Sequence, residues 1–489
     1  MEQIASLTAL VHLPCRRRSP LYPDEILSRT TRYAVLILST AAACTAACML
    51  VVAIVRLRFP YGIDYEEGNI LNTAVRMTHW LSPYPDPHGW PQILNPYGPV
   101  AYTISAACVK LFGLSLFASR IAVMLSAAAV ALLIGILLKR TTGIALLGFG
   151  FGMFYLADPV VNFWMPALRV DFIGIALVFA GLLAMREKRP SWAAILFLLA
   201  IFTKHTLLAA PAACVFWALQ ERDWQAARRL VTVCALVGGV AFVALEVATH
   251  GWFAFYLFKT HPDPFRWAAS VGWIGLLLQT NPLLLILTLA LIARDVWNRK
   301  ASLAGLYVLF ALGMAFITAG KLGSNSNHLL EPTAALLLAS GEGLWVMIIL
   351  PERARILAPL SAVLLACLVT DNLRRVEWPE RDSGCEQAIL YLRAAPGDKV
   401  MSENLAGAVL AEKTLVVSNP FVYTQLVKHA GWSDIQLVND LRSRSIGIIM
   451  LPAFHRQEWS DNVMEAIREN YREMPGCECQ YSASIFRPR

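Results

Sequence analysis

Charged side chains are scarce in this chain. Asp, Glu, Lys and Arg make up 16% of its 489 residues, whereas hydrophobic residues make up 57%. A soluble globular protein carries about 25% charged residues, so the composition excludes an ordinary soluble protein and predicts a polytopic membrane protein. The net charge of +8 does not indicate a nucleic-acid partner. Many basic residues lie in short loops between apolar runs, where they orient membrane helices.

A cleavable signal peptide and an internal repeat are also missing. The first 32 residues contain five arginines but no apolar core followed by a small-residue cleavage site, so we expect no cleaved leader. The two halves of the chain show no similarity to each other. This disfavours a transporter built from inverted repeats.

Apolar runs predict about eleven membrane spans, because a helix needs roughly 20 apolar residues to cross a bilayer. Residues 99–109 are apolar but too short to span, and we expect an interfacial or re-entrant helix there. Residues 191–220 form either one long helix or a hairpin of two short helices, and the hairpin is favoured. The other expected spans lie near 33–55, 121–138, 143–160, 171–185, 231–249, 274–293, 302–318, 332–350 and 356–370.

The distribution of basic residues predicts the orientation. The five arginines before the first span outnumber Arg56 and Arg58 after it, so we expect residues 1–32 to be cytoplasmic. Residues 33–370 would then form the membrane module. Its first outer loop, 57–120, would carry interfacial helices. The hairpin and an odd number of spans place residues 371–489 on the periplasmic side of a bacterial inner membrane.

The tail, 371–489, has the pattern of a small soluble α/β domain. The stretches "KVMSE", "TLVVS" and "IGIIML" predict short buried strands that alternate with helical stretches. Cys385 could pair with Cys477 or Cys479 in an oxidising periplasm. The alternative of a zinc site is disfavoured, because Cys477 and Cys479 are separated by one residue only.

Four polar groups fall at the predicted outer ends of helices. An ionisable residue at the edge of a membrane segment is a functional candidate, because burying it in lipid is costly. Their position on one side predicts a cavity that carries both acids and cations. The candidates are Asp64, Glu66 and Glu67, then Arg169 and Asp171, then Lys204 and His205, and finally Lys321, Asn327, His328 and Glu331.

Each group also has a structural interpretation. The first-loop acids could belong to a solvated loop. Asp171 could cap a helix while Arg169 reaches lipid headgroups. The two are two positions apart, so within a helix they would not face each other. Lys204 and His205 could mark a turn, and "GSNSNH" could be a turn and helix cap. Independent structural causes would not require all four groups on one side, which favours function.

Six motifs occur in order along residues 33–350, although each is weak alone. In this order they resemble the GT-C fold glycosyltransferases, most of all the group related to protein O-mannosyltransferases and the lipid A aminoarabinose transferase. The α/β tail is less typical of them. The motifs are "DYEEGNIL" at 64–71, "NPYGPVAY" at 95–102, "KLFGLSLFASR" at 110–120, "LRVDFIG" at 168–174, "FTKHT" at 202–206 and "GSNSNHLLEP" at 323–332.

The resemblance implies an acidic pair in the first outer loop, usually Asp-Glu, whose Asp is the catalytic base. Here Glu66 takes the Asp position and Glu67 the Glu position, which departs from the pattern. We favour Glu66 as the base, and Asp64 in a shifted register is the alternative. Asp171 matches an acid that family members use after the third span.

The resemblance further implies a polyprenyl-phosphate sugar as donor, an inverting transfer and a phosphate leaving group that needs positive charge nearby. The acceptor stays open between glycan, lipid and protein. A divalent metal ion, which some relatives bind, also stays open. The available cations are Arg169, Lys204, His205, Lys321 and His328, where the histidines count only if they are protonated.

Two other functions are compatible with the sequence. A transporter or flippase of a lipid-linked or anionic substrate would need ionisable residues at mid-membrane and repeated halves, and neither is clear. A non-catalytic membrane scaffold would make the outer acids incidental, and Glu66→Gln would then have no effect.

Overall fold

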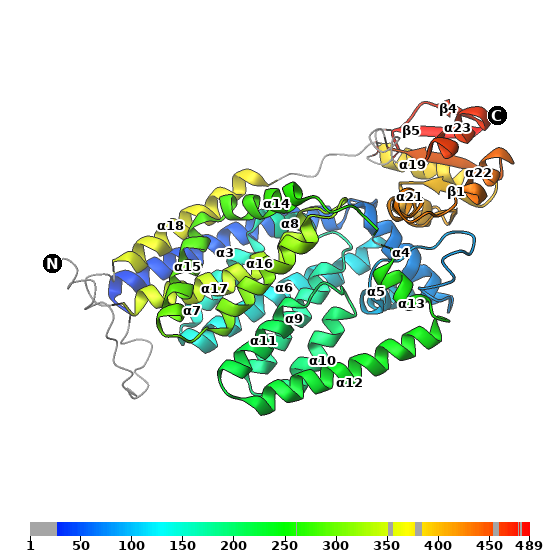
Figure 1. Ribbon diagram of the computed structural model, residues 1–489. Helices are drawn as coiled ribbons and strands as arrows, with labels where there is room; N and C mark the ends of the chain where they lie inside the picture. Colours follow the sequence, from blue (N-terminus) through cyan, green and yellow to red (C-terminus); the bar gives the residue numbers. More distant parts are fainter. Residues whose placement is uncertain are drawn as a thin grey trace.

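Helices form an elongated bundle, and a small α/β domain lies at one end of it (Figure 1). The first described helix begins at the opposite end of the bundle (Figure 1). The computed structural model describes residues 27–260, 262–350, 356–376, 384–452, 459–477, 479 and 482–489. Most of the N-terminal segment, 1–26, therefore lies outside the described residues.

The bundle is built from long helices joined by short connections. Its core helices are α3 (Arg29–Leu57), α6 (Leu116–Thr142), α7 (Ala145–Leu156), α8 (Pro159–Trp164), α9 (Asp171–Arg186), α10 (Pro190–Ile201), α11 (Ala209–Gln220), α12 (Trp224–Ala248), α14 (Trp267–Thr280), α15 (Pro282–Trp297), α16 (Leu303–Ala319), α17 (Leu330–Ile348) and α18 (Leu357–Asp371). Short helices at the domain end are α4 (Tyr65–Thr78), α5 (Pro99–Phe112), α13 (Trp252–Phe258), η1 (Ser326–Leu329) and η3 (Asn372–Arg375).

The expected apolar runs all fall on helices. Among the described residues, four helices are long and apolar enough to cross a membrane, or five when the bent pair α14–α15 counts as one span. Five further apolar helices are shorter. The chain is therefore a mainly α-helical membrane protein, and the total of eleven spans stays a prediction.

The hairpin at 191–220 is confirmed, because α10 ends at Ile201 and α11 begins at Ala209. The segment expected as one span at 274–293 is not one continuous helix. Helices α14 and α15 meet at an angle of 93°. Pro282, the first residue of α15, lacks an N–H and keeps the preceding Asn281 out of the helical conformation.

The two ends of the bundle carry different polar contacts. At the end far from the α/β domain, Arg140 pairs with Glu187 at 3.3 Å and Lys300 pairs with Glu221 at 2.8 Å. The topology predicted from the sequence would place these connections together on the inner side. The outer candidates gather at the other end, which we call the cavity end.

Close contact between small residues holds the bundle together. A Cβ on Gly148 of α7 would lie 2.3 Å from the carbonyl oxygen of Gly135 on α6. Only glycine lets the two backbones approach this closely, and such small residues are typical of helix contacts in membranes.

The C-terminal domain has one five-stranded sheet in the order β2-β1-β3-β5-β4. Strands β1 (Lys399–Ser402), β2 (Thr414–Leu415) and β3 (Ile448–Leu451) are parallel, whereas β4 (Tyr471–Met474) and β5 (Ser484–Pro488) are antiparallel additions. Its helices are α19 (Gly384–Arg393), α20 (Leu405–Leu410), α21 (Pro420–His429), α22 (Ile435–Arg442) and α23 (Asp461–Asn470).

The three strands expected in the tail are confirmed, and so is its α/β class. Strands β4 and β5 were not expected, because "YREM" is half exposed at the sheet edge and "SIFRP" ends in Arg and Pro. Cys385 forms a disulfide with Cys479, which decides between the two expected pairings.

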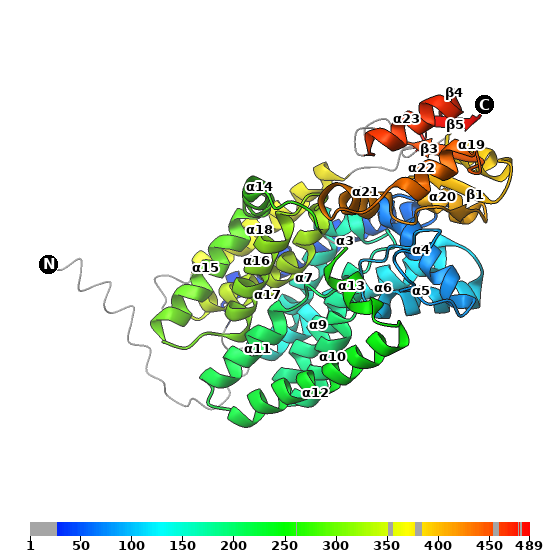
Figure 2. The same ribbon diagram turned by 45° about the vertical axis from the view of Figure 1, so that its right-hand side comes forward.

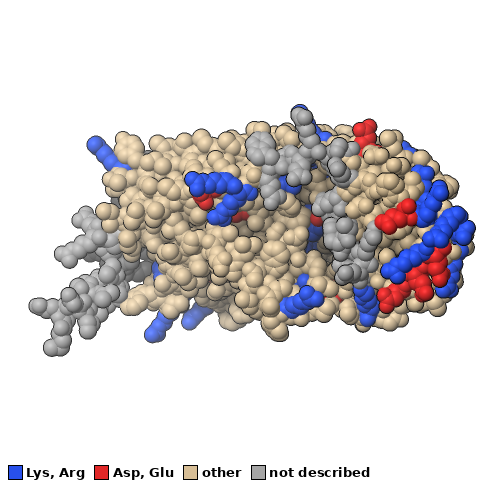
Figure 3. Space-filling view, turned by 90° about the horizontal axis from the view of Figure 1, so that it is seen from above, with Lys and Arg blue, Asp and Glu red and all other residues tan. Residues whose placement is uncertain are grey.

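The domain lies over the end of the bundle that carries α4, α5 and α13, as both ribbon views show (Figures 1 and 2). Seen from above, the bundle surface is largely uncharged, and charged residues gather toward the domain (Figure 3). An uncharged belt suits lipid, and a charged end suits water.

Candidate functional site

Helix α4 begins with a capping box that sets the direction of its acids. The Asp64 carboxylate accepts a hydrogen bond from the Glu66 amide at 3.1 Å, and the Glu67 carboxylate accepts from the Asp64 amide at 3.3 Å. These bonds satisfy amides that a helix start leaves without partners. Neighbouring helix positions lie about 100° apart, so Glu66 and Glu67 point in different directions.

Glu67 points into the protein and is fully buried. Its two oxygens accept from Nε and Nη2 of Arg120, each at 2.7 Å. The Leu168 and Ile63 amides donate to it at 2.6 Å each. Glu67 therefore joins α4 to α6 and to the segment before α9.

Glu66 points toward the cavity end and is held by two neutral amides. Asn69 Nδ2 donates to its Oε2 at 3.2 Å, and Asn419 Nδ2 donates to its Oε1 at 3.0 Å. Burial raises the pKa of Glu66 above its usual value of 4.5, and the nearby Arg169 guanidinium opposes that rise.

Asp64 has a different environment, because Arg169 Nη1 lies 2.9 Å from its Oδ2. Burial raises the pKa of Asp64, and the positive charge of Arg169 again opposes the rise. Asp64 thus combines a helix cap with an ion pair, whereas the Glu66 carboxylate is hydrogen-bonded to the neutral amides of Asn69 and Asn419.

Arg169 and Asp171 form an ion pair at 3.4 Å, so the expectation that they do not face each other is wrong. Arg169 precedes α9, and the helical spacing rule does not apply to it. Its side chain is buried, which does not fit a headgroup anchor. Asp171 also binds Lys204 Nζ at 2.6 Å. The result is a chain of alternating charges, Asp64–Arg169–Asp171–Lys204.

Three residues of this chain of charges, Asp64, Arg169 and Lys204, border a cavity of about 700 Å³ at the cavity end of the bundle. Its wall carries the acids of α4, basic side chains from the α10–α11 connection and from the segment after α16, and also Arg169 and Asp263. Eight of the expected site residues line it, namely Asp64, Glu66, Arg169, Lys204, His205, Lys321, Asn327 and His328.

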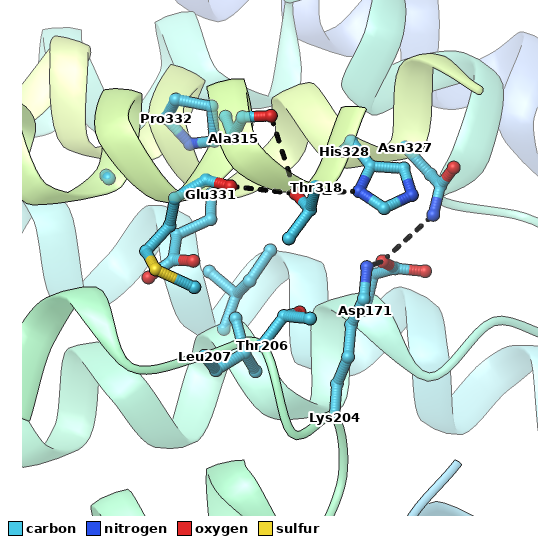
Figure 4. Close-up of a pocket in the computed structure, with 13 residues that line it drawn as sticks. Asp171, Lys204, Thr206, Leu207, Ala315, Thr318, Asn327, His328, Glu331 and Pro332 are labelled. Carbon is cyan, nitrogen blue, oxygen red and sulfur yellow. Dashed lines mark hydrogen bonds and ion pairs between the residues drawn. The ribbon is translucent and has the colours of Figure 1, made fainter. Parts of the chain in front are cut away.

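Three expected site residues do not line this cavity. Glu67 is held by Arg120. Asp171 and Glu331 border a smaller neighbouring cavity of about 20 Å³, large enough for about one water molecule. Figure 4 shows Lys204 and Asn327 pointing toward Asp171 from different elements. Asn327 Nδ2 donates to Asp171 at 3.2 Å, and Tyr307 donates to Glu331 at 3.3 Å.

Several lining residues were not expected from the sequence. Tyr97 accepts from Arg169 at 3.4 Å, and Trp164 lies under the Arg169 guanidinium, 5.3 Å from its ring centre. Phe421 and Val422 come from the C-terminal domain. The Tyr in "NPYGPVAY" was a usable signal. The last two carry none, because they lie more than 300 positions after the first-loop acids.

The site does not gather ligands for a metal ion. Within the part of the chain that the structure describes, no three His, Cys, Asp or Glu side chains come together in a way that could hold one. The residues present do not fit a protein-bound divalent ion, and the chemistry below uses none.

No protein-family model matches the sequence, and no curated protein matches it. Solved structures do. ArnT from Cupriavidus metallidurans in the apo state aligns with a TM-score of 0.62 and 15% identity, over 94% of this chain and 98% of that chain. The same protein bound to undecaprenyl phosphate gives 0.61 and 14%, over 91% and 97%.

A third match is the archaeal oligosaccharyltransferase AglB from Archaeoglobus fulgidus, in complex with an inhibitory peptide and a dolichol-phosphate. It aligns with a TM-score of 0.51 and 11% identity, over 91% of this chain and 73% of that chain. ArnT and AglB are GT-C enzymes. This chain has the GT-C fold.

The extent of the match also concerns the tail. An alignment over 94% of the chain must include most of residues 371–489, about a quarter of the length. The expectation that the α/β domain is less typical is therefore wrong with respect to ArnT. The alignment with ArnT thus covers both the helical bundle and most of the C-terminal domain.

Proposed function

We propose that this protein is a membrane glycosyltransferase that moves a sugar from a polyprenyl-phosphate donor to an acceptor on the periplasmic side, with inversion at the anomeric carbon. One observation carries the proposal. A cavity of about 700 Å³ is lined by carboxylates, among them Asp64 and Glu66, and by several basic side chains, at the end of the bundle where the charged domain begins. The GT-C fold supports the general kind of reaction.

The basic side chains suit a lipid phosphate. Lys204, His205, Lys321 and His328 all border the cavity. As the bond between the sugar and the phosphate breaks, negative charge develops on the phosphate oxygen, and fixed cations in a partly dry site stabilise it strongly. One ArnT structure holds undecaprenyl phosphate and the AglB structure holds dolichol-phosphate, which supports a lipid-phosphate partner.

Glu66 suits the role of the base better than Asp64. A base must be deprotonated before the reaction and must accept a proton from the acceptor hydroxyl or amine. Burial raises the pKa of Glu66, and its direct partners are neutral amides, which hold the carboxylate without neutralising it. Asp64 is bound to the Arg169 guanidinium at 2.9 Å, which reduces its ability to accept a proton.

The proposed step forms one bond and breaks another. The acceptor oxygen or nitrogen forms a bond to the anomeric carbon, while the bond between that carbon and the phosphate oxygen breaks. The proton of the acceptor moves to Glu66, and the polyprenyl phosphate leaves with the bonding electrons. Arg169 and Asp171 then act by orienting Asp64 and Lys204, which they contact directly.

We further propose that the protein spans the bacterial inner membrane many times, with a cytoplasmic N-terminus and a periplasmic C-terminal domain. The disulfide Cys385–Cys479 supports this, because disulfides persist in oxidising compartments. A reporter enzyme that is active only in the periplasm, fused after Arg489, should be active. An inactive fusion with full expression would reverse the topology.

The first experiment is sugar transfer by the purified protein in nanodiscs, with extracted polyprenyl-phosphate sugars as donors and with a separate measurement of donor binding. Wild type should bind and transfer, and Glu66→Gln should bind without transfer. Asp64→Asn keeps the helix cap and should lose less. Movement of the intact lipid-linked sugar across proteoliposome membranes, without transfer, would favour a transporter instead.

A further inference from the structure

The C-terminal domain is in direct contact with the helix that carries the candidate base. A Cβ on Gly68 of α4 would lie 2.2 Å from the Ala406 amide nitrogen, at the start of α20. The absence of a side chain at Gly68 is what allows α20 to rest on α4. The domain is thus placed against α4 by backbone contact and not by a flexible surface loop.

A second contact fixes the segment that follows β2. The Gln92 amide donates to the Val416 carbonyl at 2.9 Å, and the Ser418 amide donates to the Gln92 carbonyl at 2.8 Å. The Ser418 hydroxyl accepts from the Leu94 amide at 2.9 Å. These bonds extend the domain's backbone along the first outer loop and leave little freedom for the next residue, Asn419.

Asn419 uses both atoms of its amide group. Its oxygen accepts from the Val422 amide at 3.1 Å and so caps α21, while its nitrogen donates to Glu66 Oε1 at 3.0 Å. The side chain is fully buried. Two residues later, the Phe421 amide donates to the Tyr65 hydroxyl at 3.0 Å. The start of α21 is therefore held against the start of α4.

We propose that Asn419, contributed by the C-terminal domain, is a positioning residue for the Glu66 carboxylate, so that the catalytic centre is completed only when the two parts of the molecule are joined. The proposal rests on the proposed function, in which Glu66 is the base. It gives the domain a role in the reaction itself, beyond covering the cavity.

The geometry explains why a neutral donor serves here. Glu66 is faced by the Asp64 carboxylate and the Arg169 guanidinium, and by the Tyr97 and Tyr102 hydroxyls. A cation in place of Asn419 would lower the basicity of Glu66, and an acid would repel it. An amide fixes one oxygen by a hydrogen bond, Asn69 fixes the other, and the carboxylate keeps unshared electron pairs for a proton.

Asn419→Asp separates the two tasks of this side chain. The Asp oxygen can still cap α21, because Asp is a good N-cap residue. The donor to Glu66 is lost, and a second carboxylate takes its place. A like charge raises the pKa of its neighbour, and each unit of rise lowers the deprotonated fraction about tenfold below the pKa.

We therefore expect Asn419→Asp to move the acid limb of the kcat profile to higher pH and to lower kcat on that limb about tenfold for each unit of the shift. Binding of the polyprenyl-phosphate sugar, KM and the unfolding midpoint should change little. Asn404→Asp is the matched control. Asn404 caps α20 through the Gly407 amide at 2.9 Å but donates to the Ser482 hydroxyl at 3.1 Å, so its profile should keep the wild-type position.

A folded Asn419→Asp variant with wild-type kcat and an unmoved profile would overturn the proposal. If that variant does not fold, Asn419→Ser takes its place, because Ser keeps the cap without a second charge. It should lose kcat with no rise in the limb, and wild-type kcat would overturn the proposal equally.

The outcome for Glu66 is read separately. Full transfer by Glu66→Gln would remove the base itself, and with it the proposed function. Loss of transfer in Glu66→Gln together with an unaffected Asn419→Asp would reject only the role of Asn419.

Discussion

Two neighbouring glutamates of α4 have opposite environments. Glu67 is fully buried and bonded to Arg120 and to backbone amides, far from solvent. Glu66 borders the cavity and is held by two neutral amides. Both are acids, and both lie in the same motif. The environment around each side chain separates a structural ion pair from a candidate base.

The contrast shows that adjacent residues of one type can have different roles. A buried ion pair gains little net stability, yet it is very costly to break, because the partner left behind is a buried charge. Such a pair fixes geometry. A base needs the reverse, a carboxylate that keeps its affinity for a proton. The capping box around Asp64 sets the helix rotation that places one glutamate on each side.

Glu66→Gln tests the glutamate that borders the cavity and has the largest expected effect. The amide cannot accept the acceptor's proton, so transfer should fall about 10²–10⁴-fold, the usual loss for a general base. The unfolding midpoint should stay near wild type. The check is single-turnover transfer beside thermal unfolding in the same nanodiscs. A fall in the unfolding midpoint large enough to explain the lost transfer would contradict the prediction.

Glu67→Gln tests the buried glutamate that pairs with Arg120. It leaves the Arg120 charge without its partner, so the free energy of unfolding should fall by about 3–5 kcal/mol. Glu187→Gln is the control, because Glu187 forms an exposed pair with Arg140 and should cost about 0–1 kcal/mol. Denaturant unfolding in detergent measures both. Similar values for the two variants would show that Glu67 is not structurally special.

Exchange of Gly68 for Ala tests the contact between the two parts. The added Cβ meets the backbone of α20, so we expect a loss of about 1–3 kcal/mol, the usual cost of overpacking, and faster proteolysis of the C-terminal domain. Gly239→Ala on α12 is the control, because no atom lies within 4 Å of its added Cβ. Equal proteolysis of both variants would argue against a tight contact.

The pH profile is the finest test. Burial raises the pKa of Glu66 above 4.5, and only the deprotonated acid can accept a proton. Transfer should therefore rise with pH through a midpoint above 4.5 and then level off, with a small change near neutral pH. The same raised pKa means that the contribution of Glu66 to stability falls as pH rises through this window. A rate that stays constant down to pH 4.5 would exclude Glu66.

Local patterns predicted much of the fold. Apolar runs located the helices, and the hairpin favoured at 191–220 is the one that α10 and α11 form. Three strands of the tail followed from short apolar runs. These features depend on composition within a window of a few tens of residues. The break at Pro282 carried a local signal as well, but the apolar run around it favoured one span.

The candidate site was predictable only in part. Polar side chains at predicted helix ends marked eight of the residues that line the cavity. Their partners were not visible, because the Arg169–Asp171 pair depends on where α9 begins and the Asn419–Glu66 contact joins positions 353 apart. A sequence states which residues carry charge. The folded backbone decides which of them meet.

With the C-terminal domain in the periplasm, as proposed, the disulfide would link the maturation of this protein to its export. In the chain-entropy model, closing a loop of 94 residues stabilises a domain by about 4–5 kcal/mol. A tail retained in a reducing cytosol would forgo that bond. Since this same domain supplies Asn419, catalytic competence would arise only after translocation. The cell would thereby be protected from an enzyme that consumes lipid-linked sugars on the wrong side of its membrane.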